Sequence, residues 1–276
     1  MRTKAFGLLL LISLALTPAP ASAQWWREIL QGKPRQAAPA TECVFDHCDQ
    51  PNGAGTVPAT PAAPAQQTAP PPPPLPRAPQ PVPSSNVAPG NFDFYVLSLS
   101  WSPGFCDTNA GASSKSQCDA GSNAGFVVHG LWPQFEHGFP ADCGGDEASR
   151  TALASTRGLF PDEGLARYEW RKHGTCTGKQ AEDYFGDVRR VRQSIRIPDA
   201  FAAPREQQSF APGDILRAFG EVNPQFRAGM GAVGCTRGEL QEVRFCIAKD
   251  LSGFRPCPEV AAQSCRARQI AVPPLR

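Results

Sequence analysis

The sequence lacks the features that would mark a membrane protein, a strongly basic nucleic-acid-binding protein or a serine hydrolase. Its 276 residues hold 27 Lys and Arg against 25 Asp and Glu, so neither sign of charge dominates. No apolar run reaches the length of about 20 residues that a membrane-spanning helix needs, and no G-x-S-x-G segment occurs. We therefore expect no membrane span, no tight RNA binding by a broad basic surface and no serine hydrolase chemistry.

The first 23 residues have the pattern of a secretory signal peptide. Arg2 and Lys4 precede the apolar run 5–16, and the segment ends in the small residues Ala21, Ser22 and Ala23. Its removal would leave equal numbers of basic and acidic residues. We expect the protein to be secreted or periplasmic.

Composition divides the remaining chain into three parts. Residues 51–90 are rich in Pro, Ala, Gln and Thr, which predicts an extended linker. Residues 24–50 hold Trp25, Trp26 and the pair Cys43 and Cys48, and they are too few for a substantial core. This short segment is interpreted as a small disulfide knot or a surface-anchoring arm. Residues 91–276 are left as the folded domain.

Ten cysteines in a chain with an export signal predict disulfides rather than metal sites. Proximity along the chain suggests that Cys106 pairs with Cys118 and Cys43 with Cys48. Zinc at Cys43, His47 and Cys48 is the alternative, but three closely spaced ligands fit a structural zinc site poorly. We expect no metal and no cofactor.

Hydrophobic periodicity within residues 91–276 predicts strands and helices in alternation. Strands are expected at 92–101, 125–129 and 239–248, and helices at 159–173, 181–195 and 214–222. This order is typical of the α+β class. Four arginines on the helix 181–195 and just beyond it predict either a solvated face or a groove that follows phosphates, and the solvated face is favoured.

Two segments place half of the four histidines in settings suited to proton transfer: FVVHGLWPQ at 126–134 and YEWRKHGTC at 168–176. In the first, we expect Gly130 to turn the backbone sharply after His129. In the second, Glu169, Lys172 and His173 stand at i, i+3 and i+4, which places an acid, a cation and a base on one face of a helix. A Glu–Lys surface pair would explain only part of this pattern. His137, in a loop flanked by Gly, is expected to be a surface residue.

The two segments together resemble the ribonuclease T2 family, whose active-site segments read approximately HGLWP and HEW-x-KHGTC. The resemblance covers roughly residues 91–276 and implies an antiparallel β-sheet packed by helices and stapled by disulfides. It implies endonucleolytic cleavage of single-stranded RNA through a 2′,3′-cyclic phosphate, with low base specificity. His173 would be the base and His129 the acid, while Lys172 and Glu169 would stabilise the phosphorane.

The resemblance also implies substrate contacts and three further disulfides. Trp132 would stack on a nucleobase, and Gln134 would contact the base. Tyr168 replaces a third histidine of the family, and its hydroxyl would donate a hydrogen bond to phosphate. The implied disulfides are Cys143–Cys176, Cys235–Cys265 and Cys246–Cys257.

RNA is the expected substrate, and the protein is expected to be a monomer. DNA should not be cleaved, because it lacks the 2′-hydroxyl that serves as the nucleophile. The alternative is a non-catalytic, secreted RNA-binding or cell-surface module, which the Trp- and Pro-rich N-terminal arm would suit. A cysteine hydrolase is less favoured, because the cysteines are expected to be bonded.

Overall fold

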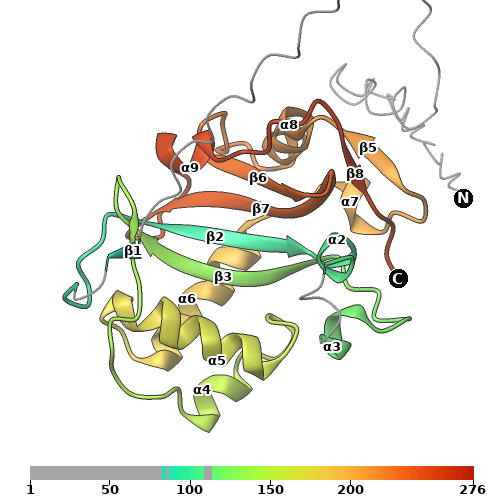
Figure 1. Cartoon of the computed structure of the whole chain (residues 1–276). Helices are drawn as coiled ribbons and strands as arrows, with labels where there is room; N and C mark the ends of the chain where they lie inside the picture. Colours follow the sequence, from blue (N-terminus) through green and yellow to red (C-terminus); the bar gives the residue numbers. More distant parts are fainter. Residues whose placement is uncertain (1–82, 85–86, 109–113) are drawn as a thin grey trace, which may run out of the picture. The chain divides into compact units, whose positions relative to one another are not determined.

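The computed structural model of the chain describes residues 83–84, 87–108 and 114–276 (Figure 1). Residues 1–23, 24–50 and most of 51–90 lie outside these ranges. The predictions of a signal peptide, a short Cys-containing segment and a Pro-rich linker therefore stay predictions, as does the Cys43–Cys48 pair.

A six-stranded sheet forms the centre of the described region. Its path runs β3-β2-β7-β8-β5, and β6 also pairs with β7. All pairings are antiparallel except that of β7 with β8, which rests on the single pair Glu239 and Ala271. The predicted α+β class is confirmed, with a sheet that is mixed at this one point. The strands are β2 (Phe94–Trp101), β3 (Phe126–Gln134), β5 (Gln208–Phe210), β6 (Gly231–Thr236), β7 (Glu239–Ala248) and β8 (Ile270–Val272).

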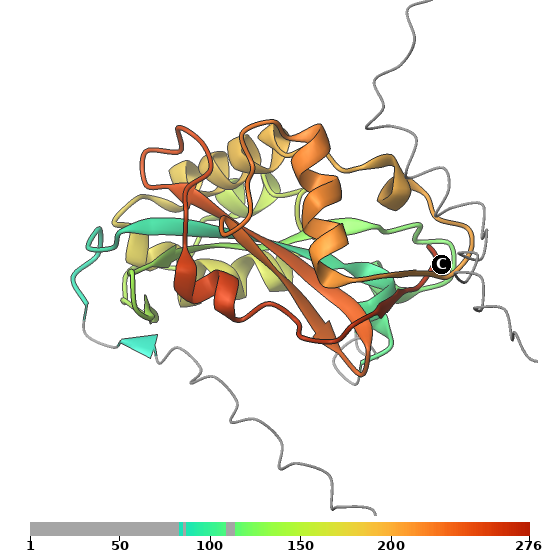
Figure 2. The ribbon, with the colours of Figure 1, turned by 90° about the horizontal axis from the view of Figure 1, so that it is seen from above.

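Helices cover one face of the sheet, and the short helix α9 lies against the other (Figures 1 and 2). A separate two-stranded parallel sheet pairs β1 (Pro83–Ser84) with β4 (Phe139–Pro140). The helices are α2 (Ser102–Cys106), α3 (Lys115–Cys118), α4 (Arg150–Ala154), α5 (Glu163–Lys172), the 3-10 helix η3 (Gly174–Thr177), α6 (Ala181–Ser194), α7 (Asp199–Ala202), α8 (Pro212–Val222) and α9 (Pro258–Ala262).

The main core lies between the sheet and helices α6 and α8. Leu97, Leu131 and Phe245 come from three adjacent strands and are fully buried. Tyr184 of α6 is also fully buried, and its hydroxyl donates a hydrogen bond of 3.1 Å to the carbonyl oxygen of Leu131. On α8, the ring of Phe219 lies 5.1 Å from that of Phe245. Burial of these side chains provides the main driving force that fixes the sheet against the helices.

A smaller apolar cluster lies around α9. Val96 of β2 and Cys246 of β7 are direct cross-strand partners, and Val260 of α9 belongs to the same buried group. Trp132 of β3, the cross-strand partner of Val96 on the other side, packs against this group. Because side chains alternate across a strand, this face of the sheet is distinct from the core face that holds Leu97 and Leu131.

The predicted elements agree with the structure to within two residues except around the two histidine segments, and the first predicted strand begins at Phe94 rather than at residue 92. Strand β7 has the predicted bounds, and helices α6 and α8 correspond to the predictions at 181–195 and 214–222. Strand β3, however, continues to Gln134 rather than ending at residue 129. It is an edge strand of the sheet, where Pro133 can sit without removing a hydrogen bond of a central ladder.

Four disulfides join cysteines of the described region, each with the expected partner. The pair predicted from proximity, Cys106–Cys118, is formed. The three pairs that the family resemblance implied are confirmed: Cys143–Cys176, Cys235–Cys265 and Cys246–Cys257. Cys246–Cys257 lies in the apolar cluster below α9, and Cys143–Cys176 fixes η3 directly after the second histidine.

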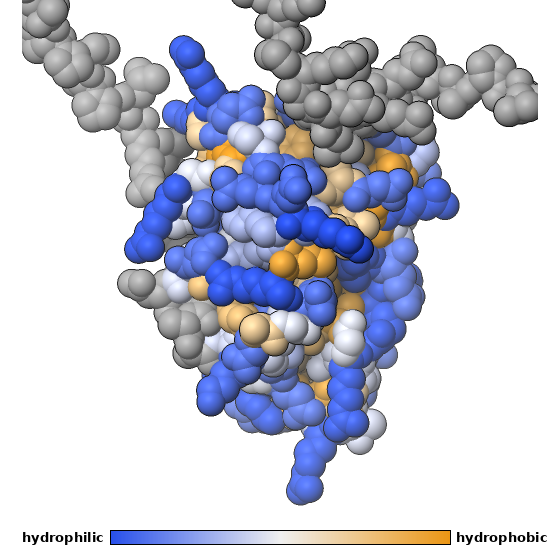
Figure 3. Space-filling view, turned by 90° about the vertical axis from the view of Figure 1, so that its right-hand side faces the viewer, coloured by the Kyte–Doolittle hydropathy of each residue, from blue (hydrophilic) through white to orange (hydrophobic). Residues whose placement is uncertain are grey.

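Hydrophilic side chains cover most of the side that carries the C-terminal residue, and hydrophobic side chains form only small patches there (Figure 3). No helix of the described segments combines the length and the apolar character needed to cross a membrane.

Candidate active site

His129 is the extra residue of a β-bulge between β2 and β3. Ser98 is paired with Gly130 and the next residue, Leu99, with Val128, so His129 has no partner on β2. A bulge re-aims the side chain of the extra residue, and such irregularities are common beside active sites. The imidazole accordingly lies near Trp132, with the two ring centroids 5.2 Å apart.

Gly130 has a different role from the one predicted. The backbone does not turn there, because β3 continues beyond it. A Cβ atom at this position would lie 2.2 Å from Glu169 Oε2 and 2.2 Å from Trp132 Nε1. The absence of a side chain thus makes room for a hydrogen bond of 2.7 Å that Trp132 Nε1 donates to Glu169 Oε2.

Helix α5 carries Glu169, which lies in the site, and ends three residues later at Lys172. It begins after Asp162, whose side chain accepts a 2.8 Å hydrogen bond from the Leu165 amide. The predicted start at residue 159 is therefore too early. The helix ends at Lys172, and His173 follows with φ −127° and ψ −42°. Because His173 has left the helix, the expectation that it shares a helical face with Glu169 and Lys172 is wrong.

The three side chains of this segment accordingly point to different partners. Glu169 is buried against β3, and its Oε1 lies 3.7 Å from Nε2 of His129. Lys172 Nζ donates a 2.7 Å hydrogen bond to Asp142, which raises the pKa of Lys172. The ring of His173 lies 5.4 Å from that of Trp132. The segment therefore brings Glu169 and His173 to the strand that carries His129. Lys172 instead lies at the edge of the site, bound to Asp142.

His129 lies between two carboxylates. Glu169 faces Nε2, and Oε2 of Glu242 from β7 lies 3.5 Å from Nδ1. The side chain of His129 is 41% exposed. Burial lowers the pKa of His129, but the hydrogen bond to Glu242 and the charge of Glu169 outweigh it, so the pKa is raised. This environment favours the protonated imidazolium.

His173 has the opposite environment. Only 9% of the residue is exposed, and its Nδ1 is buried without a hydrogen-bond partner in the described part of the chain. Burial, together with the positive charges of Lys172 and His129, lowers the pKa of His173 to about 3. The ring is therefore neutral near pH 7 and has a lone pair for accepting a proton.

Glu169 is poised between its two protonation states. Burial raises the pKa of its carboxyl group to about 7, while His129 and the hydrogen bond from Trp132 work against this rise. Near neutral pH the group can therefore either accept or donate a hydrogen bond.

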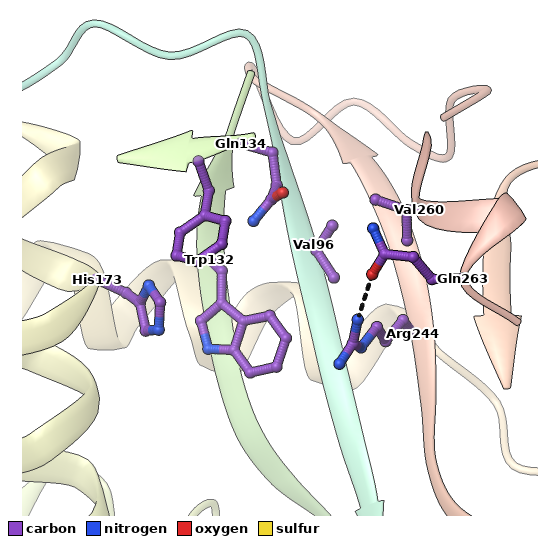
Figure 4. A pocket seen from close by; sticks show the side chains of 8 residues that line it. Val96, Trp132, Gln134, His173, Arg244, Val260 and Gln263 are labelled. Carbon is purple, nitrogen blue, oxygen red and sulfur yellow. Dashed lines mark hydrogen bonds between the residues drawn. The ribbon is translucent and has the colours of Figure 1, made fainter. Parts of the chain in front are cut away.

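A cavity of about 290 Å³ opens beside Trp132 (Figure 4). Gln134, which is buried, provides an amide at its wall, and Arg244 Nη1 donates a 3.1 Å hydrogen bond to Gln263 Oε1 across from it. The guanidinium carbon of Arg244 lies 5.4 Å from the centre of the Trp132 ring. Aromatic, amide and guanidinium groups in one small cavity suit a flat, polar-edged ligand. The lining residues are Val96, Trp132, Gln134, Phe139, His173, Arg244, Val260 and Gln263.

Three further residues of this region, Tyr168, His137 and Trp170, do not line the cavity. Tyr168 is 48% exposed, and it contributes to the raised pKa of Lys172. His137 is an exposed residue of the loop after β3, as predicted, and its Nδ1 lies 3.0 Å from Glu259. Trp170 is buried, and its indole nitrogen donates a hydrogen bond to the carbonyl oxygen of Asp146.

Two arginines of α6 form local contacts, and a third, Arg189, donates to the carbonyl oxygen of Ser155 after α4. Arg190 forms an ion pair with Asp187 one turn away, and Arg192 donates to the carbonyl oxygen of Ile195. Helix α6 lies on the core face of the sheet (Figure 1). Trp132 packs on the other face, and the ring of His129 lies beside it. The favoured interpretation of a solvated helix face fits this placement better than a groove leading to the histidines.

Glu242 and Arg244 are site residues that the sequence prediction missed. They stand at i and i+2 on β7, so both side chains project from the face that carries Trp132. A strand with charges on one face and Val243 and Phe245 buried on the other is a signal that was present in residues 239–248. Among the described residues, no group of three or more His, Cys, Asp or Glu is arranged to hold a metal ion.

The chain is similar to known ribonucleases. The model of the Ribonuclease T2 family matches residues 92–257. The chain is 38% identical over 172 residues to a ribonuclease of Aeromonas hydrophila, covering 62% of this chain and 78% of that protein. It is 36% identical over 149 residues to a probable ribonuclease of Haemophilus influenzae, covering 49% and 52%.

The solved structure of trichomaglin, described as an S-like ribonuclease, has the same fold. The TM-score is 0.55 at 22% identity, and the match covers 67% of this chain and all of that one. Both histidine segments lie within the matched residues 92–257. The chain belongs to the ribonuclease T2 family.

Proposed function

We propose that this protein is an endoribonuclease that cleaves single-stranded RNA by acid–base transphosphorylation. The observation that carries the proposal is the contrast between His129 and His173, whose rings lie 5.2 and 5.4 Å from that of Trp132. The pKa of His129 is raised, and the pKa of His173 is lowered. An acid and a base near the same tryptophan ring are suited to the in-line transfer of phosphorus between two hydroxyl oxygens.

In the first step, neutral His173 accepts the proton of the 2′-hydroxyl, and the 2′-oxygen attacks the adjacent phosphorus. The bond from phosphorus to the 5′-oxygen breaks, and protonated His129 donates its proton to that oxygen. The products are a 2′,3′-cyclic phosphate and a free 5′-hydroxyl. Water then opens the ring with the two histidines in reversed roles. Because the nucleophile is already part of the substrate, the first step needs no metal-activated water.

Lys172 and Glu169 stabilise the charge that develops on the phosphorane. Lys172 is held by Asp142 at the edge of the site and attracts phosphate oxygens as a cation. Glu169 lies beside Nε2 of His129, and in its protonated form it donates a hydrogen bond to a phosphate oxygen.

Trp132 and Gln134 bind the nucleobase in the cavity beside the histidines. Stacking on an aromatic ring contributes about 1–3 kcal/mol per base and tolerates every base. Gln134 offers both a donor and an acceptor to the edge of the base. This combination supports low base specificity. Tyr168 contacts the phosphate backbone from its exposed position on α5.

We further propose that residues 91–276 form the catalytic domain of a secreted or periplasmic monomer. Residues 1–23 serve as its signal peptide, residues 24–50 as a short Cys-containing segment and residues 51–90 as the linker. The pattern around Arg2 and Lys4 and the four disulfides of the described region support export to an oxidising compartment.

Analysis of the product ends from a defined oligoribonucleotide tests this function. The expected result is a 2′,3′-cyclic phosphate with EDTA present, and no cleavage of the matching DNA. The variant His137→Phe, which changes an exposed histidine outside the cavity, is the matched control and retains activity. Binding of RNA without any cleavage would instead establish the non-catalytic RNA-binding alternative.

A further inference from the structure

Glu242 contacts His129 on the side away from Glu169. Its Oε2 lies 3.5 Å from Nδ1, whereas Glu169 Oε1 lies 3.7 Å from Nε2. A neutral imidazole carries its proton on one ring nitrogen, and an imidazolium carries one on each. The partner of Nδ1 therefore sets the tautomer of the neutral ring and the orientation of both forms. Hydrogen bonds at catalytic sites are often long in free enzymes and shorten with substrate bound.

The carboxylate of Glu242 is fixed by its own contacts. Ser98 Oγ donates a 2.6 Å hydrogen bond to Oε2, and Arg244 Nε donates a 2.9 Å hydrogen bond to Oε1. A second nitrogen of Arg244, Nη2, lies 2.5 Å from the same Oε1. The side chain of Glu242 is only 14% exposed. Both oxygens therefore have partners, and the group cannot rotate without breaking charge-assisted hydrogen bonds.

Glu242 remains ionised over the whole physiological range. Burial raises the pKa of its carboxyl group, but Arg244, His129 and Ser98 outweigh this and lower it to about 2. The charge on this side of His129 is thus permanent, whereas that of Glu169 changes near neutral pH.

The neighbouring strand leaves space for this arrangement. Gly234 of β6 is the cross-strand partner of Glu242. A Cβ atom at Gly234 would lie 2.6 Å from Glu242 Cγ. A larger residue at this position would force the side chain of Glu242 to shift.

We propose that Glu242 is the positioning residue of His129. It accepts a hydrogen bond from the Nδ1–H group, holds the imidazole in the bulge of β3, and leaves Nε2 to carry the proton that goes to the 5′-oxygen. Glu242 touches no reacting atom, and Ser98 and Arg244 hold it in place. This inference rests on the proposed acid role of His129. The charged and titratable groups that face or influence His129 are Glu169 and His173 at α5, and Glu242 and Arg244 on β7.

The test is Glu242→Gln, which keeps the shape and an acceptor for Ser98 but removes the charge. Its kcat on a dinucleotide is expected to fall by roughly 10- to 100-fold, as for the loss of a partner that orients a metal-bound histidine. Loss of the negative charge also lowers the pKa of His129. Because His129 must be protonated to act as the acid, the alkaline limb of the kcat profile moves to lower pH.

NMR titration of the His129 ring, assigned by its loss in His129→Phe, measures the same pKa without any activity. Glu259→Gln is the matched control, since it removes a carboxylate from another histidine, His137, and leaves the titration of His129 unchanged. An unshifted His129 pKa in folded Glu242→Gln overturns the positioning role. If the parent protein cleaves no RNA, the proposed function fails, but the titration still decides whether Glu242 controls His129.

Discussion

The two histidines of the site differ in the elements that carry them and in their surroundings. His129 sits in the bulge of an edge strand, 41% exposed, between two carboxylates. His173 follows the last turn of α5, is nearly buried, and has a lysine as its neighbour. One residue type thus acquires opposite proton affinities from burial and from the sign of nearby charge. This difference supports His129 as the acid and His173 as the base, an assignment that the spacing of the motifs left to the family resemblance.

Replacing either histidine is expected to cause the largest loss. His129→Phe and His173→Phe should each lower kcat by about 10²- to 10⁴-fold, the usual contribution of a general acid or base. Single-turnover cleavage of a dinucleotide measures this, and His137→Phe is the control. Full activity in either variant would remove that histidine from the mechanism.

Lys172→Met should have the next largest effect. Of the two histidines, it should change the pKa of His173 and not that of His129. Removing one group that stabilises transition-state charge typically costs about 10²- to 10³-fold in kcat. The positive charge of Lys172 also lowers the pKa of His173. Its loss raises that pKa, so the acidic limb of the pH profile moves to higher pH.

Arg171→Met is the matched control for Lys172, because it removes an exposed cation from the adjacent position of α5. The pH–rate profiles of both variants should be compared with that of the parent protein. A shift of the acidic limb in both variants, or in neither, would show that the charge of Lys172 does not act on His173.

The two histidines should also affect folding stability with opposite signs. The pKa of His173 is lowered to about 3, so between about pH 6.5 and pH 3 the unfolded chain binds a proton that the folded chain does not. Stability is therefore lost as the pH falls through this window, by at most roughly 1.4 kcal/mol per pH unit. The pKa of His129 is raised, so its contribution is present below about pH 6.5 and is lost as the pH rises through the folded pKa.

Denaturant unfolding at a series of pH values measures these slopes. His173→Phe should flatten the decline of stability in acid, and His129→Phe should flatten a decline just above neutral pH. The same acid slope in His173→Phe as in the parent protein would mean that His173 is not buried in its neutral form.

Several of the strands, helices and disulfides around this site could be predicted from the sequence. The alternation of residues 239–248 predicts strand β7. The three further disulfides follow from the family resemblance. The bulge at His129 could not be predicted, because it arises from the pairing of β3 with β2. Likewise, the hydrogen bond from Ser98 to Glu242 joins residues 144 positions apart. A local pattern contains no information about such partners.

The smallest expected effect is at Tyr168. Its hydroxyl is placed on an exposed side chain beside Lys172, and a neutral donor is roughly half as strong as a charged one. Tyr168→Phe should raise KM modestly, and Tyr168→His should lower KM at acidic pH while kcat stays nearly constant. Steady-state kinetics on a short oligonucleotide measures this, and an unchanged KM in both variants would leave Tyr168 with no contact to phosphate.

The most direct test of the difference between the two histidines is a pH titration of both rings by NMR in the parent protein. The signals are assigned with His129→Phe and His173→Phe. The expected result is that His129 titrates above pH 6.5 and that His173 stays neutral until the pH approaches about 3. Titration of His173 at or above the pKa of His129 would contradict the assignment of His129 as the acid and His173 as the base.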